Sequence, residues 1–341
     1  MIKIMKEAIL YEKMKNKAVK CHVCCHYCTI AEGKRGFCGV RENKDGKLYS
    51  LVYGKVIAAH VDPIEKKPFF HWLPGSYSLS IATVGCNFRC LHCQNYDISQ
   101  MPRDRNGQIF GEEMSAKEIV DLAKKNNLPS ISYTYTEPTV FVEFALETMK
   151  LAKKQGLKNN WVTNGYMSKE TLELIAPYLN AANVDLKFFD DGLYQKICGA
   201  RLQSVLDSLK WIKKNKIWVE VTTLVIPDYT NQGNQFEEIA NFIKKELGLE
   251  TPWHISRFYP AYKLLDLPPT PVETIYQAYE IGKKAGLKYV YAGNLPGSEY
   301  ENTYCSKCGE LSIKRVAYEI KRFDKNGRCR KCGESLNLIL K

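Results

Sequence analysis

Three closely spaced cysteines are the residues of this sequence most able to do chemistry. Cys86, Cys90 and Cys93 lie in the segment "VGCNFRCLHCQNYDISQ" with the spacing C-x3-C-x2-C. Three cysteines are one ligand short of a closed tetrahedral zinc site. Zinc would want a histidine as the fourth ligand, but His92 lies between Cys90 and Cys93, where the direction of its side chain competes with theirs. An iron–sulfur cubane suits the spacing, because cysteines on one loop can each bind a different iron. The fourth iron would then be open to a substrate.

A second group of cysteines lies near the end of the printed sequence. The segments "CSKCGE" and "CRKCGE" form two C-x2-C pairs with 20 residues between them, and each pair precedes a glycine suited to a tight turn. Four thiolates make a closed tetrahedral set, which predicts a structural zinc ribbon. A rubredoxin-like iron site and a redox dithiol are the alternatives. The predicted ligands are Cys305, Cys308, Cys329 and Cys332.

A third group, "CHVCCHYCTIAEGKRGFC", lies near the beginning. It predicts a metal site on Cys21, Cys24, Cys28 and Cys38. A single metal ion is one interpretation, but the ligand set is ambiguous, because Cys25, His22 and His26 lie nearby. Free thiols in a small cap are the alternative, and the identity of the metal stays open.

Composition limits the expected cellular location and the expected state of the cysteines. The 341 residues include thirteen cysteines but neither a signal-peptide pattern nor an apolar run long enough to span a membrane. We therefore expect a cytoplasmic protein without membrane association, in which reduced thiols bind metals rather than form disulfides. The net charge of +12 is compatible with an RNA or acidic partner, or with lysines on solvated helix faces.

From about Tyr77 onward, strand-like runs alternate with helical periodicity. The runs are "YSLSIATV", "SISYTY", "NNWVTN", "ANVDLKFF", "WVEVTTLV", "PWHISRF" and "KYVYAG". The helical segments between them are 116–126, 139–155, 168–179, 201–215, 234–247 and 271–285. Repeated βα units predict a parallel sheet with right-handed crossovers, either doubly wound or curled into a barrel.

Polar residues fall at the ends of these runs. The cysteine loop follows the first run, Glu137 the second and Asn164 the third, while Asp185 and Lys187 lie in the fourth. In a parallel barrel the carboxyl ends of the strands meet at one mouth, so we expect these residues to converge. Cysteine groups outside the pattern predict three modules: a Cys-rich cap (1–76), a core (77–296) and the zinc ribbon (297–341).

The cysteine spacing on a loop after the first strand resembles that of the radical SAM superfamily. The segments "DPIEKKPFFHWLPGS", "TNG", "DLKFFDDGLYQKICGA" and "YAGNLPGSEYENTYC" look like those of AmmeMemoRadiSam-system radical SAM enzymes, relatives of the pyruvate formate-lyase activating enzymes. The resemblance implies an α/β fold with a partial (β/α)6 TIM-like barrel. It also implies that the open iron of a [4Fe-4S] cluster chelates S-adenosylmethionine (SAM).

The implied chemistry is reductive cleavage of SAM to methionine and a 5′-deoxyadenosyl radical, which abstracts hydrogen. A reductant such as ferredoxin or flavodoxin is implied, and the substrate is a protein, an RNA or a small molecule. Glu137, Asn164, Asp185 and Lys187 are the candidate cofactor contacts. One departure is "TYTEP", where activating enzymes typically carry Gly-Gly-Glu-Pro. The alternative function is a non-catalytic metal-binding module that recognises RNA or protein.

Overall fold

The computed structural model describes residues 6–295 and 297–340, so the predicted module boundary at residue 296 lies outside the described residues. Its centre is an eight-stranded sheet in which β8 runs antiparallel to β9 and the other neighbours are parallel. The order across the sheet is β16 (Val290–Gly293), β15 (Trp253–Arg257), β14 (Trp218–Val225), β13 (Ala181–Asp185), β12 (Lys158–Thr163), β11 (Ser130–Tyr133), β9 (Tyr77–Ala82) and β8 (Ala58–Pro63). All seven predicted strand runs therefore form strands, in chain order.

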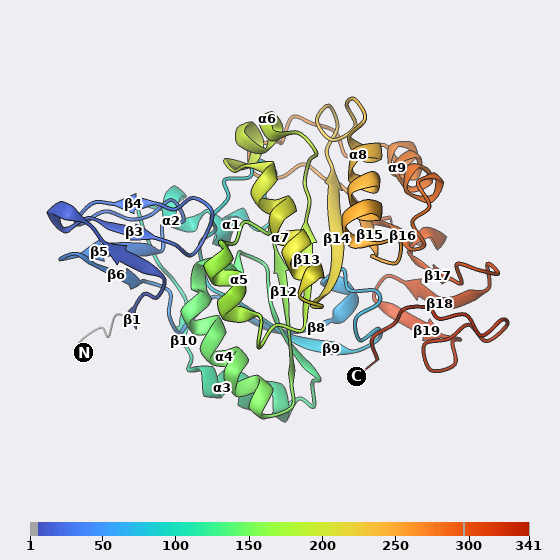
Figure 1. Ribbon diagram of the computed structural model, residues 1–341, viewed down its shortest axis with the longest axis horizontal. Coiled ribbons are helices and arrows are strands. Elements are labelled where there is room, and N and C mark those ends of the chain that lie inside the picture. The colour runs from blue at the N-terminus through green and yellow to red at the C-terminus, as the bar shows by residue number, and fades with distance from the viewer. Residues whose placement is uncertain (1–5, 296, 341) are drawn as a thin grey trace.

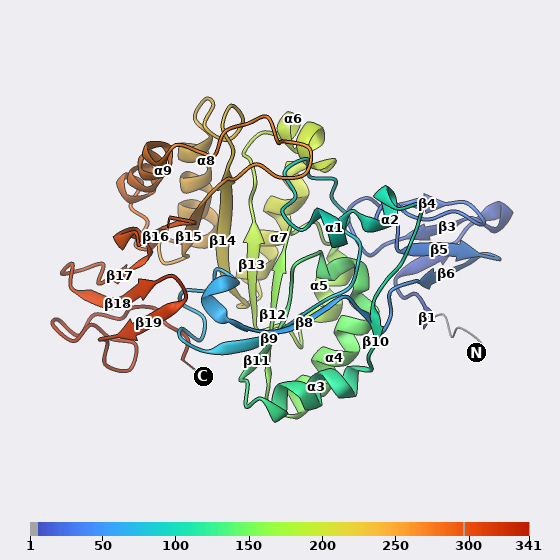
Figure 2. The same cartoon turned by 180° about the vertical axis from the view of Figure 1, so that it is seen from behind.

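Helices connect the parallel strands and cover one face of the sheet (Figure 1). From behind, the strands lie in front of α4, α5 and α7 (Figure 2). The connecting helices are α3 (Ala116–Lys125), α4 (Val142–Lys154), α5 (Lys169–Ile175), α7 (Leu202–Lys214), α8 (Gln235–Phe242) and α9 (Val272–Lys284). The α/β fold is thus confirmed. The described strands form an open sheet with β8 and β16 at its edges, and its curvature into a partial barrel stays a prediction.

The two faces of the sheet differ because side chains alternate along each strand. On β9, Leu79 and Ile81 belong to the main hydrophobic core, whereas Ser78 and Ser80 point to the other face. Ser78 Oγ lies 2.6 Å from Ser132 Oγ of β11. Further along the sheet, the Thr222 hydroxyl of β14 donates to Asn183 Oδ1 of β13 at 2.8 Å. One face is therefore apolar beneath the helices, and the other is polar although buried.

Two small sheets form the N-terminal region, shown in blue in Figure 1. The first has the order β1 (Lys6–Glu7), β6 (Lys47–Ser50), β5 (Arg41–Lys44), and the second has the order β2 (Tyr11–Lys13), β3 (Val19–Cys21), β4 (Thr29–Ile30). Val19 and Val40 join the main hydrophobic core. Arg41 also forms a buried ion pair of 2.7 Å with Glu143 of α4. The cap is thus packed on the core, and strand β8, inside the range 1–76, belongs to the main sheet.

The C-terminal region lies at the opposite side of the molecule (Figure 1). Its three-stranded sheet has the order β17 (Thr303–Tyr304), β18 (Leu311–Val316), β19 (Glu319–Arg322). Arg315 of β18 is buried, and its guanidinium donates to the Phe70 carbonyl at 2.8 Å and to the Thr303 hydroxyl at 2.8 Å. The segment 64–76, which links β8 to β9, therefore anchors this region to the sheet.

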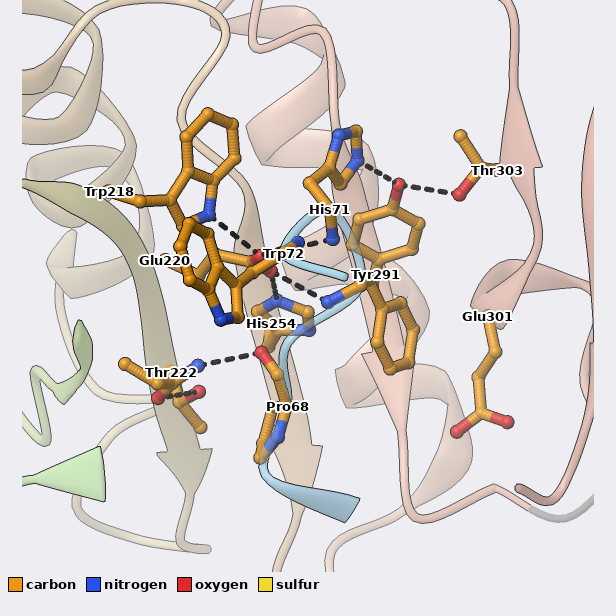
Figure 3. A network of polar contacts seen from close by, with 12 residues as sticks. Pro68, His71, Trp72, Trp218, Glu220, Thr222, His254, Tyr291, Glu301 and Thr303 are labelled. Atoms are coloured by element: carbon orange, nitrogen blue, oxygen red, sulfur yellow. Dashed lines mark hydrogen bonds and ion pairs between the residues drawn. The ribbon is translucent and has the colours of Figure 1, made fainter. Parts of the chain in front are cut away.

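Glu220, near the amino end of β14, fixes the 64–76 segment from the other side (Figure 3). Its carboxylate accepts from the backbone N–H groups of Phe70, His71 and Trp72 at 3.0 to 3.1 Å. His254 Nε2 lies 2.7 Å from the same carboxylate. This network lies at the amino ends of the strands, away from the ends that carry the cysteine loop. We interpret it as the structural reason for the "PFFHW" sequence.

His71 makes the attachment of the C-terminal region sensitive to acid. Its ring lies 2.6 Å from the Tyr291 hydroxyl (Figure 3). The other ring nitrogen lies 3.2 Å from the Asn337 carbonyl. Burial, aided by the charge of Arg315, lowers the pKa of His71 to about 4. An unfolded histidine binds its proton at an ordinary pKa of about 6.5. The stabilisation is therefore present above pH of about 6.5 and is lost as the pH falls toward 4.

We expect wild type to lose about 2 kcal/mol of unfolding free energy between pH 7 and pH 5 relative to His71→Gln. The comparison with the variant is needed because burial raises the pKa of Glu301 to about 7, and that carboxyl responds to acid in the opposite sense in both proteins. Denaturant titration at the two pH values measures the difference. Parallel curves for the two proteins would contradict the assignment to His71.

Candidate active site

The cysteine loop leaves β9 at its carboxyl end and leads to α1 (Tyr96–Ser99) and α2 (Met101–Asp104). Cys86 and Cys90 are buried and Cys93 is partly exposed. Gly85 has φ +99°, and a Cβ there would lie 2.5 Å from Val40 Cγ1, so this position needs glycine for both conformation and space. The Phe88 N–H donates to Cys86 Sγ at 3.3 Å. The loop backbone thus turns around the Cys86 thiol and donates a hydrogen bond to it.

Two sets of hydrogen bonds with other parts of the chain hold the loop. Arg103 of α2 donates to the carbonyls of Cys86 at 2.7 Å and Phe88 at 2.9 Å. The N–H groups of Arg89 and Leu91 donate at 2.7 and 3.0 Å to carbonyls in the π-helix Tyr194–Cys198. The backbone is therefore fixed on both sides without using the thiols.

The three thiols do not form a compact ligand group of the kind that holds a single ion. Among the described residues, one group of at least three possible ligands has its ligand atoms mutually within 4.8 Å, and that group is at the C-terminal end, not on this loop. His92 is buried, and neither of its ring nitrogens has a hydrogen-bond partner within the described chain. A buried imidazole without a partner is costly, so this position calls for a polar partner that the described chain does not supply. These residues fit an iron–sulfur cluster with a further ligand.

Glu137 and Asn164, at the carboxyl ends of β11 and β12, lie beside the cysteine loop. Glu137 is 1% exposed, and its carboxylate accepts from the Asn164 N–H at 2.8 Å and the Thr163 hydroxyl at 2.8 Å. Burial raises the pKa of Glu137. Asn164 Nδ2 lies 2.7 Å from Asn87 Oδ1 and 3.8 Å from Cys86 Sγ. The predicted convergence on the cysteine loop is therefore present, while contacts with SAM stay a prediction.

The unusual "TYTEP" segment keeps the conformation that glycine would favour. Tyr135 has φ +63°, in the left-handed region that costs a non-glycine residue about 1 kcal/mol. Its hydroxyl donates to Asp62, and the Lys67 ammonium lies 3.9 Å from the centre of its ring. Lys67 and Asp62 form an ion pair of 2.8 Å. The "DPIEKK" segment therefore stabilises the turn in place of glycine.

Asp185 and Lys187 form an ion pair of 2.8 Å where β13 ends. Burial lowers the pKa of Lys187, but the charges of Asp185, Cys90 and Cys198 outweigh burial and raise it well above its usual value. Lys187 thus lies close to the cysteine loop and is a cation there. Its role as a cofactor contact stays a prediction.

Cys198, the last residue of the π-helix Tyr194–Cys198, lies against Cys90. Its side chain is fully buried, and the Cys198 thiol is the main cause of the raised pKa of Cys90. Cys198 therefore lies next to Cys90 but belongs to a different segment from the cysteine loop. Cys198 stands apart from the three cysteine groups in the sequence, so no local pattern placed it beside Cys90.

We expect Cys198→Ser to keep the iron content of wild type, because a packing residue beside Cys90 is not a ligand. Cys90→Ser is the matched variant, and it should lose the cluster. Iron analysis after anaerobic reconstitution compares the two. Loss of iron from Cys198→Ser equal to that from Cys90→Ser would contradict the three-ligand site.

The C-terminal cysteines form the compact metal-binding group. The sulfur atoms of Cys305 and Cys332 lie 3.6 Å apart, as do those of Cys308 and Cys329. A backbone N–H from Cys332 is the main cause that lowers the pKa of Cys329 to about 7. A zinc ion with bonds of about 2.3 Å separates its sulfur ligands by about 3.8 Å. The four thiols therefore fit one tetrahedral ion.

A parallel α/β sheet with three cysteines on the loop after its first parallel strand defines a class of iron–sulfur enzyme. Residues 80–243 match the family model of the Radical SAM superfamily. The chain belongs to this superfamily, and it is an enzyme related to the pyruvate formate-lyase activating enzymes. The superfamily implies a [4Fe-4S] cluster and SAM as cofactors. No helix in the described part of the chain is long and apolar enough to cross a membrane.

Three individual proteins illustrate what the chain is similar to. An uncharacterized protein of Methanocaldococcus jannaschii, MJ0808, is 48% identical over 98% of this chain and 100% of its own length. The pyruvate formate-lyase-activating enzyme of Clostridium pasteurianum is 25% identical over 50% of this chain and 72% of its own. Streptococcus suis SuiB bound to its precursor peptide SuiA has a similar fold, with a TM-score of 0.50, 15% identity, and coverage of 68% of this chain and 51% of that one.

Proposed function

We propose that this enzyme reductively cleaves SAM at a [4Fe-4S] cluster on Cys86, Cys90 and Cys93, and abstracts hydrogen from a protein, an RNA or a small molecule. The cluster supplies the electron, and SAM supplies the 5′-deoxyadenosyl radical. The observation that carries the proposal is the loop itself: three thiols beside a buried His92 that has no partner within the described residues.

The chain's own residues have separable roles in this proposal. Arg103 and the π-helix fix the loop backbone, as their hydrogen bonds indicate. Glu137 holds the Asn164 N–H, so it orients the amide of Asn164 toward Cys86 and the cofactor. Lys187 places a positive charge beside the thiolates. The polar face of the sheet continues from this end and offers hydrogen-bond donors and acceptors to a substrate.

A reductant such as ferredoxin or flavodoxin would supply the electron. The non-catalytic metal-binding function is not favoured, because the relatives include named activating enzymes. Zinc at the four C-terminal thiols would be structural, since that site is closed.

Binding of SAM to the cluster can be tested without turnover. We expect SAM to change the electron paramagnetic resonance spectrum of the anaerobically reduced wild type. Asn164→Ala should require more SAM for the same spectral change, because the amide of Asn164 reaches the site. The variant should keep its iron, because all three thiols remain. A spectrum of the wild type that stays the same at saturating SAM would contradict an open iron.

A further inference from the structure

The N-terminal cysteines enclose a pocket between the cap and the core. Val140, in the 3-10 helix Pro138–Phe141, completes the lining of the pocket. Four thiols and one guanidinium line it: Cys21, Cys24, Cys28, Cys38 and Arg41. We propose that these four thiolates hold a second iron–sulfur cluster, and not a single metal ion.

The structure resolves which side chains belong to this site. Cys25 faces away, since its thiol donates to the Met167 carbonyl at 3.0 Å. His22 lies 3.5 Å from Glu12 and 3.8 Å from Glu170. His26 Nε2 lies 2.7 Å from the Asn87 carbonyl. Both histidines and Cys25 therefore have other partners, which leaves four thiols.

The four thiols are near one another without being gathered for one ion. Cys21, Cys24, Cys28 and Cys38 all line the same pocket. Yet no three of them meet the mutual 4.8 Å limit that the C-terminal thiols satisfy within the described residues. Since each cysteine of a cubane binds a different iron, its sulfur ligands must lie farther apart than those of one zinc.

Arg41 adds an independent indication of an anionic occupant. It is 2% exposed, and its Nη2 donates to Glu143 at 2.7 Å. Its Nε and Nη1 have no hydrogen-bond partner among the residues that the structure describes. Buried guanidinium N–H groups without acceptors are costly, and the sulfur atoms of an anionic cluster would accept from them.

The pocket adjoins the loop of Cys86. Arg103 donates to the Phe37 carbonyl at 2.9 Å as well as to the Cys86 carbonyl at 2.7 Å. A Cβ on Gly85 would lie 3.4 Å from the Cys38 carbonyl oxygen, so the two loops are in contact. This contact suits transfer of one electron: the reductant, a ferredoxin or flavodoxin, loses it, and the iron centre on the Cys86 loop gains it. This electron path rests on the proposed function, whereas the second cluster does not.

Metal content tests the second cluster directly. After anaerobic reconstitution, we expect about eight irons and one zinc in wild type, and about four irons in Cys24→Ser/Cys28→Ser. Cys25→Ser, a change to the adjacent thiol that faces away, should keep about eight irons. The variant Cys86→Ala/Cys90→Ala/Cys93→Ala provides a second measurement if the cap variant fails to fold. It should keep about four irons that give a paramagnetic signal on reduction.

Two zinc ions with about four irons in wild type, or a triple variant without iron, would overturn the second cluster. Failure of SAM cleavage in a protein with about eight irons would instead count against the proposed function alone. The electron path has its own measurement. Reduced flavodoxin should reduce the cluster on the Cys86 loop more slowly in Cys24→Ser/Cys28→Ser than in Cys25→Ser. Equal rates of reduction would overturn the path.

Discussion

Replacing Cys86, Cys90 and Cys93 together with alanine should abolish SAM cleavage and remove about four irons while leaving the C-terminal zinc in place. The three thiols are the predicted protein ligands of the cluster, and the backbone that carries them is fixed independently by Arg103 and by the π-helix. The loop should therefore keep its fold without them. Metal analysis by mass spectrometry and assay of 5′-deoxyadenosine measure the two effects.

The control for this variant is that the rest of the molecule keeps its fold. The main core is formed by the helices and the apolar face of the sheet, so circular dichroism should stay close to that of wild type. Retention of the full wild-type iron content would contradict the assignment of the cluster to this loop.

Cys308→Ser should unfold the C-terminal region locally, because structural zinc contributes on the order of 10 kcal/mol to a small domain of this kind. The region has little apolar core of its own: Cys305, Cys329 and Leu336 form its buried cluster. Hydrogen exchange should become fast after about residue 300, while β9 to β16 remain protected.

Ser306→Ala is a matched control, since it changes the same knuckle without removing a ligand. Slow exchange in Cys308→Ser, equal to that in Ser306→Ala, would show that this region folds without the metal. The contacts of Arg315 with the 64–76 segment would then have to hold it.

Much of the core could be predicted from the sequence, because the spacing of apolar residues indicates which face of a helix or strand is buried. The helical segment 116–126 was recognised from apolar spacing, and α3 spans Ala116–Lys125 with Ser115 and Glu118 forming a capping box. The convergence of Glu137 and Asn164 on Cys86 followed from parallel strands ending at one edge. Local pattern and topology were sufficient there.

The contacts that fix the site could not be predicted, because they join segments far apart in the chain. Nothing local to Arg103 indicates that it binds the carbonyls of both Phe37 and Cys86. Nothing local to Tyr135 indicates that Asp62 and Lys67 hold it in a left-handed turn. The N-terminal ligand set was ambiguous for the same reason: only the fold turns Cys25 away from its neighbours.

The most direct test of the central claim is the formation of 5′-deoxyadenosine from SAM by the reduced, fully reconstituted enzyme. We expect slow formation even without the true substrate, with methionine appearing in equal amount, and none from the variant that lacks the three loop cysteines. Chromatography with mass detection measures both products. A wild type that carries the cluster, accepts an electron and still yields no 5′-deoxyadenosine would contradict the account.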